Sequence, residues 1–74
     1  MSRLIRMDHT GDSTLAEWSA SDPASVEAAV TEFRRQLDDG YFAVVSDAQG
    51  HAEQVRELPL DAELVILRRP IVGG

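Results

Sequence analysis

The chain has 74 residues, a formal net charge of −6 and no cysteine. A chain of this length forms one domain and buries only about 60% of the surface that its unfolded form exposes, so a deep catalytic cleft is not expected. The lack of cysteine excludes disulfides, thiolate metal sites and a cysteine nucleophile. The acidic balance disfavours nucleic acid as a partner.

The hydropathy pattern also bears on location. No apolar run approaches the roughly 20 residues that a membrane span needs, and the first residues have no apolar core of the length that a signal peptide requires. We therefore expect a cytoplasmic protein with no membrane partner. We also expect no cofactor.

The first segment has the pattern of a β-hairpin. Ile5 and Met7 alternate with Arg6, which is typical of a half-buried strand. The sequence "HTGD" then supplies turn residues, because Gly11 tolerates a positive φ and aspartate side chains hydrogen-bond a turning backbone. The residues from Thr14 onward favour a second strand, so we predict a hairpin that ends near Trp18. A lone tryptophan in so small a domain is more often a core residue than an anchor for a partner.

The next segment predicts a helix of about four turns. Asp22 suits the N-cap position and Pro23 suits the first helical position. Gly40 suits the C-terminal cap. One apolar stripe follows at helical spacing, and it consists of Val26, Ala29, Val30, Phe33 and Leu37.

The remaining chain reads as strands. "YFAVVSDAQG" predicts a strand and a turn, "EQVRELPL" a shorter strand that ends at Pro59, and "ELVILR" the last strand. We predict an α+β domain over residues 1–68 with the order ββαββ, in which one helix packs on a mixed sheet of four to five strands. Residues 69–74 then form a flexible tail.

The last strand is apolar on both of its sides. Leu64 and Ile66 point to one face, and Val65 and Leu67 to the other, but a single helix covers only one face. We predict that the uncovered face is a binding surface. Its residues are expected to be Ala43, Val45, Arg56, Val65 and Leu67. The alternative is that these are scattered surface hydrophobic residues, which are common.

The end of the chain, "LDAELVILRRPIVGG", carries a resemblance to a family. A short acidic turn, an alternating apolar strand, two arginines and a terminal Gly-Gly follow one another. Together with the order of the preceding elements, this ending resembles the ubiquitin-like β-grasp family. The similarity covers the whole chain, but only Gly73-Gly74 is motif-like.

The resemblance implies a function as a protein modifier. In this family an E1-like enzyme adenylates the C-terminal carboxylate, here that of Gly74, and the product is joined to amines on protein targets. Arg68, Arg69 and the uncovered sheet face would then bind the activating enzyme, and an E2-like enzyme and a JAB-type peptidase would be further partners. Residues 69–74 can span about 20 Å when extended, and glycine permits a close backbone approach.

Two other functions stay open. Ile71 and Val72 are closer to the related ThiS and MoaD sulfur carriers, whose C-terminus becomes a thiocarboxylate. A binding module with an incidental Gly-Gly is the third reading. All seven basic residues are arginine, which excludes lysine-linked chains of this protein on itself, although a GC-rich genome would also explain the bias.

No catalytic group stands out. His9, Asp12 and Ser13 lie in one predicted hairpin turn, whereas triad partners usually come from separate parts of a fold. Asp8, His9, Asp12 and His51 do not have the spacing of a known metal-binding loop. We expect solvated turn residues, no metal site and no enzymatic activity.

Overall fold

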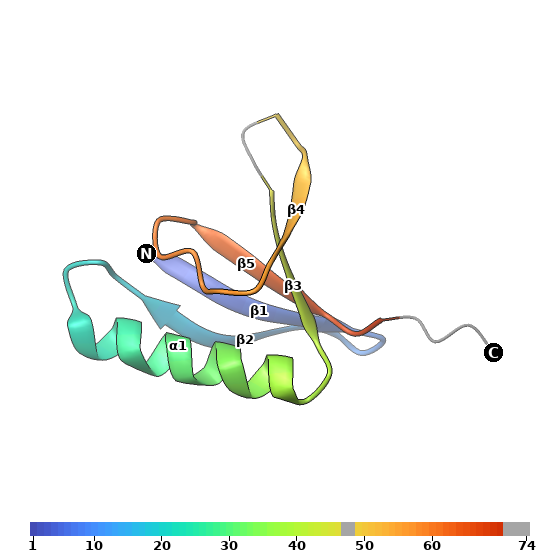
Figure 1. The fold of residues 1–74 in the computed structure, drawn as a ribbon, viewed down its shortest axis with the longest axis horizontal. Coiled ribbons are helices and arrows are strands. Elements are labelled where there is room, and N and C mark those ends of the chain that lie inside the picture. The colour runs from blue at the N-terminus through green and yellow to red at the C-terminus, as the bar shows by residue number, and fades with distance from the viewer. Residues whose placement is uncertain (47–48, 71–74) are drawn as a thin grey trace.

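The protein is a small α+β domain in which one helix packs against a five-stranded mixed sheet (Figure 1). The computed structural model describes residues 1–46 and 49–70. The predicted class is confirmed. Three strands follow the helix, as the three strand-like segments predict, whereas the predicted ββαββ order contains only two. The elements are β1 (Ser2–Asp8), β2 (Gly11–Trp18), α1 (Pro23–Asp38), β3 (Phe42–Ser46), β4 (Ala52–Val55) and β5 (Leu64–Arg68).

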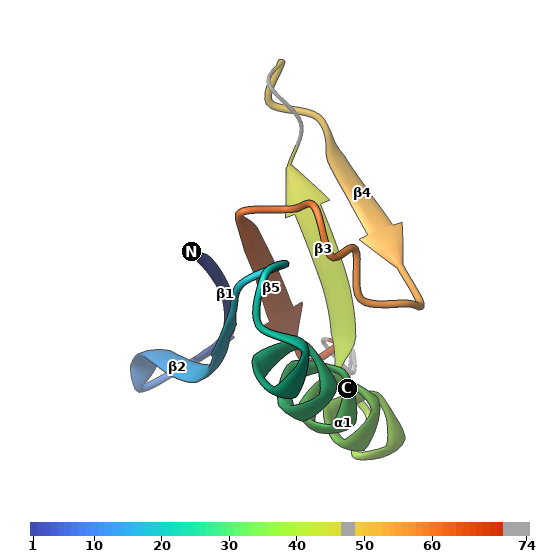
Figure 2. The same ribbon diagram turned by 90° about the vertical axis from the view of Figure 1, so that its left-hand side faces the viewer.

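The first and last strands lie side by side in the middle of the sheet. The strand order is β2-β1-β5-β3-β4; β1 and β5 are parallel, and the other neighbours are antiparallel. The helix covers one face (Figure 2). Because β1 and β5 run in the same direction, the end of β5 lies at the same end of the domain as the β1–β2 turn and the end of α1 (Figure 1).

The hairpin forms as the sequence predicts. Gly11 adopts a φ of +117°, and the Asp8 carboxylate accepts hydrogen bonds from the backbone N–H and the hydroxyl of Thr10, at 2.8 and 2.5 Å. The register shifts between Leu4 and Ile5, where β2 carries Leu15 as an extra residue. This β-bulge lies in an edge strand of the sheet.

Both ends of α1 are capped. The Asp22 carboxylate accepts from the Ser25 N–H at 3.4 Å, and the next residue is the predicted first helical proline. At the other end Gly40 adopts a φ of +100°. Its N–H donates to the Leu37 carbonyl, and the Tyr41 N–H donates to the Gln36 carbonyl, both at 3.1 Å. These two bonds form a Schellman motif, which fixes where the chain goes after the helix.

The core lies between α1 and the sheet. Trp18 is fully buried as predicted, and its indole N–H donates to the Leu60 carbonyl at 3.1 Å. Ala29 and Phe33 from the predicted helical stripe are buried with it. The sheet contributes Leu4, Ala43, Val65 and Leu67 to the same cluster.

The predicted assignment of the two sheet faces is wrong. Ala43, Val65 and Leu67 are 0% exposed, and half-buried Val45 packs against their cluster, so this face lies under the helix. The uncovered face instead carries the alternate residues of each strand. Three of them, Ile5, Ile66 and Val44, are direct neighbours across β1, β5 and β3.

The corrected faces predict opposite outcomes for two aspartate substitutions in β5. Leu67→Asp places a carboxylate in the core, which costs several kcal/mol, while a 74-residue domain has a total stability of about 4–11 kcal/mol. We expect Leu67→Asp to unfold the protein or to remove most of its free energy of unfolding. Urea denaturation followed by circular dichroism measures this quantity.

Leu64→Asp is the matched control, because Leu64 is 37% exposed on the other side of the same strand. We expect it to fold with a loss of about 1–2 kcal/mol. A folded, stable Leu67→Asp variant would contradict the burial described here.

Candidate functional site

The end of the domain from which the tail leaves is hollowed into a pocket. Four parts of the chain meet there: the end of β1, the β1–β2 turn, the residue before β3 and the end of β5. The pocket has a volume of about 540 Å³ and is lined by Met7, Asp8, His9, Tyr41, Arg68, Arg69 and Pro70. It contains the two arginines predicted to bind a partner.

Arg68 and Arg69 take different environments, because consecutive strand residues point to opposite faces. The Arg68 guanidinium lies on the uncovered face, where Nη2 is 3.9 Å from the Met7 sulfur. Arg69 continues the helix-facing alternation of Val65 and Leu67, and its Cζ lies 5.1 Å from the centre of the Tyr41 ring. Neither guanidinium has an ion pair among the residues that the structure describes.

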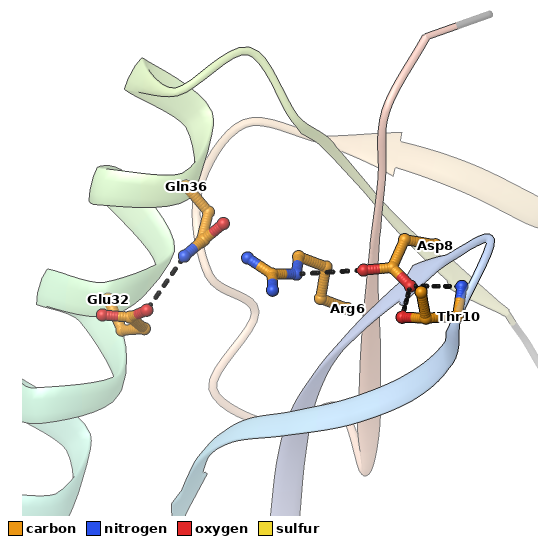
Figure 3. A network of polar contacts seen from close by, with 5 residues as sticks. All are labelled: Arg6, Asp8, Thr10, Glu32 and Gln36. Carbon is orange, nitrogen blue, oxygen red and sulfur yellow. Dashed lines mark hydrogen bonds and ion pairs between the residues drawn. The ribbon is translucent and has the colours of Figure 1, made fainter.

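A third arginine, Arg6, approaches the same ring from β1. Its Cζ lies 5.6 Å from the centre of the Tyr41 ring, and its Nε lies 3.8 Å from Asp8 Oδ2. Figure 3 shows the guanidinium between Asp8 and the helical residue Gln36. The two hydrogen bonds from Thr10 lower the pKa of Asp8, with a smaller contribution from Arg6. Asp8 therefore stays ionised beside Arg6.

The helix contributes a buried amide behind Arg6. Gln36 is 3% exposed, and its Nε2 donates to Glu32 Oε1 at 3.0 Å (Figure 3). Arg35 also donates to Glu32, at 2.8 and 3.1 Å. The pKa of Glu32 is lowered, mainly by the bonds from Arg35 and then by that from Gln36. Within the described part of the chain, Gln36 Oε1 and Arg6 Nε are buried without a hydrogen bond.

Sequence reasoning did not single out Arg6, Gln36 or Tyr41 as members of this site. A signal for Gln36 was present, because it lies three residues after Phe33 on the apolar stripe. For Tyr41 the signal was its position after the capping glycine, which fixes the chain direction. The alternation of Ile5 and Met7 with Arg6 directs attention to the apolar side of β1, whereas the side that faces the helix carries Leu4 and Arg6.

The other predicted partner-binding residues do not join this site. Ala43, Val65 and Leu67 are in the core, and Arg56 is exposed just after β4. The predicted conjugation residues, Gly73 and Gly74, lie outside the described residues, as do Ile71 and Val72. The structure therefore brings together Arg68 and Arg69 alone from the predicted set.

The hairpin residues considered for catalysis do not form a triad. His9, Asp12 and Ser13 are exposed, and Asp12 and Ser13 point to opposite sides of β2. Over residues 1–46 and 49–70, no group of three or more His, Asp or Glu side chains converges as a metal site would require. The same residues contain no helix that could cross a bilayer.

The chemistry that this pocket offers is recognition. Two guanidiniums that have no carboxylate partner within residues 1–46 and 49–70, a phenol ring and a histidine surround it. Guanidinium groups bind carboxylates and phosphates through directed hydrogen bonds. A search against protein-family models, curated proteins and solved structures finds no match to this chain.

The low pKa of Glu32 gives a prediction for the pH dependence of stability. A carboxyl whose folded-state pKa is lowered stabilises the fold above its unfolded pKa, about 4.5, and that contribution disappears as the pH falls through the folded-state value. Glu32→Gln should therefore lose about 0.5 kcal/mol at pH 7, as expected for a partly exposed helical pair, and little at pH 3.

The measurement is urea denaturation of both proteins between pH 7 and pH 3. Glu27→Gln removes an exposed carboxylate from the same helix and is the control for net charge. An equal difference between native protein and Glu32→Gln at every pH would show that the carboxylate charge contributes nothing.

Proposed function

We propose that this protein is a ubiquitin-like modifier with a β-grasp fold, activated at Gly74 by an E1-like adenylating enzyme and conjugated to amines on protein targets. The observation that supports this most is the position of β5. This strand is paired on both sides, with β1 and with β3, up to its last residues. A tail that ends in Gly-Gly thus continues from a central strand of the sheet.

This arrangement suits chemistry performed on the terminus by another enzyme. The folded domain offers a surface for recognition by the enzyme. Residues 69–74 can span about 20 Å when extended. Arg68 and Arg69 stand where the tail begins and supply guanidiniums for acidic groups of the enzyme. The domain needs no catalytic groups of its own for this function.

A sulfur carrier is the alternative function, because it uses the same adenylation of a terminal glycine. Ile71-Val72 before the glycines favours this alternative, and the arginine pair favours the modifier. The two functions differ in the fate of the activated carboxylate, which goes to a target amine in one and to a thiocarboxylate in the other.

With the two sheet faces corrected, the proposed docking surface for the enzyme is the face of the sheet that the helix does not cover. Ile5, Ile66 and Val44 form one row across its three central strands. Ile66 lies in the middle of this row and is half-buried. Arg68, where the tail begins, lies two residues after Ile66 on the same side of β5 and is therefore beside this row.

A substitution at the centre of this row tests the docking surface. Ile66→Thr keeps the branched shape and replaces apolar surface with a hydroxyl, so we expect thermal stability to fall by a few degrees. The KM of the adenylating enzyme for the variant should rise about tenfold, as expected for an apolar contact worth about 1.4 kcal/mol. Thr14→Ser, at the edge of the same face, is the control, and an unchanged KM for Ile66→Thr would remove this row from the interface.

The central test of the proposed function is deletion of Gly74. The deletion leaves the terminal carboxylate about 3.5 Å short of the reaction centre, and displacements of about 1 Å can slow a catalysed step about a hundredfold. We expect the deletion to abolish ATP–pyrophosphate exchange by the cognate enzyme and to change the melting temperature by less than about 1 °C.

Undiminished exchange by the shortened protein would exclude activation at Gly74. Where exchange is lost, mass spectrometry of the protein from cells separates the two functions. A modifier is found joined through Gly74 to a target amine, and a sulfur carrier is found with one oxygen of that carboxylate replaced by sulfur.

A further inference from the structure

We propose that Tyr41 is a positioning residue that holds the base of the tail through Arg69 and so sets the direction in which the tail leaves the domain. Its consequence for activation rests on the proposed function, but the contact itself does not. The inference rests on the backbone hydrogen bond that fixes Tyr41, on the contact between Arg69 and its ring, and on the second contact of that ring with Arg6.

The helix end fixes Tyr41. Gly40, at a φ of +100°, turns the chain, and the Tyr41 N–H donates to the Gln36 carbonyl at 3.1 Å. Tyr41 is half-buried and packs against the core cluster, and β3 begins at the next residue. The ring is therefore held between a capped helix and a strand that pairs with β5.

The tail base reaches this ring through one of its two arginines. The alternation of β5 places Arg69 on the helix side, with its Cζ 5.1 Å from the ring centre, within the range of a cation–π contact. The following residue, Pro70, restricts the backbone of Arg69 to extended conformations. The side chain and the backbone of Arg69 are thus both constrained, whereas the Arg68 guanidinium lies on the opposite face, 3.9 Å from the Met7 sulfur.

Arg6 supports the ring from β1. Its Cζ lies 5.6 Å from the ring centre, and Asp8 balances its charge. Gln36 stands behind it on α1 (Figure 3). Tyr41 is therefore contacted by β1 and by Arg69 at once, which connects the position of Arg69 to that of the hairpin.

The structural test compares three proteins by NMR: native, Tyr41→Phe and Tyr41→Leu. Phenylalanine keeps the aromatic face and leucine removes it. We expect the δ-protons of Arg69 to be shifted upfield by the ring, and its amide to be ordered like β5, in the native protein and in Tyr41→Phe. Both signatures should be lost in Tyr41→Leu, and an Arg69 amide that stays equally ordered in Tyr41→Leu would overturn the proposal.

A second pair of variants distinguishes the loss of this contact from a general loss of structure in Tyr41→Leu. Arg69→Gln removes the same contact from the tail side, and Arg68→Gln is its matched control on the opposite face. The order of residue 69 should fall in Arg69→Gln alone. Equal order in both variants would also overturn the proposal.

The activity test measures ATP–pyrophosphate exchange by the cognate enzyme. We expect Tyr41→Leu to raise KM about two- to fivefold, the factor that corresponds to an exposed cation–π contact, with kcat unchanged, and Tyr41→Phe to restore the native KM. A lowered kcat with an unchanged KM would overturn the positioning role. If the native protein supports no exchange, the proposed function fails, while the NMR comparison still decides whether Tyr41 holds the tail base.

Discussion

The parallel pairing of β1 with β5 is the interaction on which the rest of the domain depends. It joins strands from opposite ends of the chain over four residue pairs, from Arg3 with Leu64 to Arg6 with Leu67. β2 attaches to one side of this pair and the β3–β4 hairpin to the other. Among residues 1–46 and 49–70, no other ladder joins β1 and β2 to the three strands that follow the helix. The β1–β5 pairing also places the tail base beside the hairpin turn, and so creates the pocket.

The local elements follow from local signals, which explains why the sequence predicts them well. Asp22 and Pro23 begin the helix, Gly40 ends it, and Gly11 turns the hairpin, each for a stereochemical reason that acts within a few residues. The faces of the sheet could not be predicted in the same way. Both alternations of β5 are apolar, so hydrophobicity alone does not say whether Ile66 or Leu67 meets the helix.

The candidate site was predicted only in part for a related reason. Arg68 and Arg69 attract notice as a pair, but their different roles depend on which face of the sheet the helix covers. Gln36 is buried and Arg6 is half-buried, although both are polar, and their burial follows from the packing of α1 against the sheet rather than from their own hydropathy. The arginine pair near the end of the chain can be recognised in the sequence pattern. The Tyr41 ring that Arg69 contacts comes from the end of the helix.

The bulge in β2 has a consequence for how copies of this protein meet. A flat edge strand offers unpaired backbone groups to a neighbouring molecule, and proteins discourage such pairing with bulges, charges and short edges. Here one edge, β2, is interrupted at Leu15 and carries Asp12 and Glu17, and the other edge, β4, has only four residues. Both open edges of the sheet therefore resist strand addition. Crowded molecules of this protein then have little tendency to join their sheets through these edges.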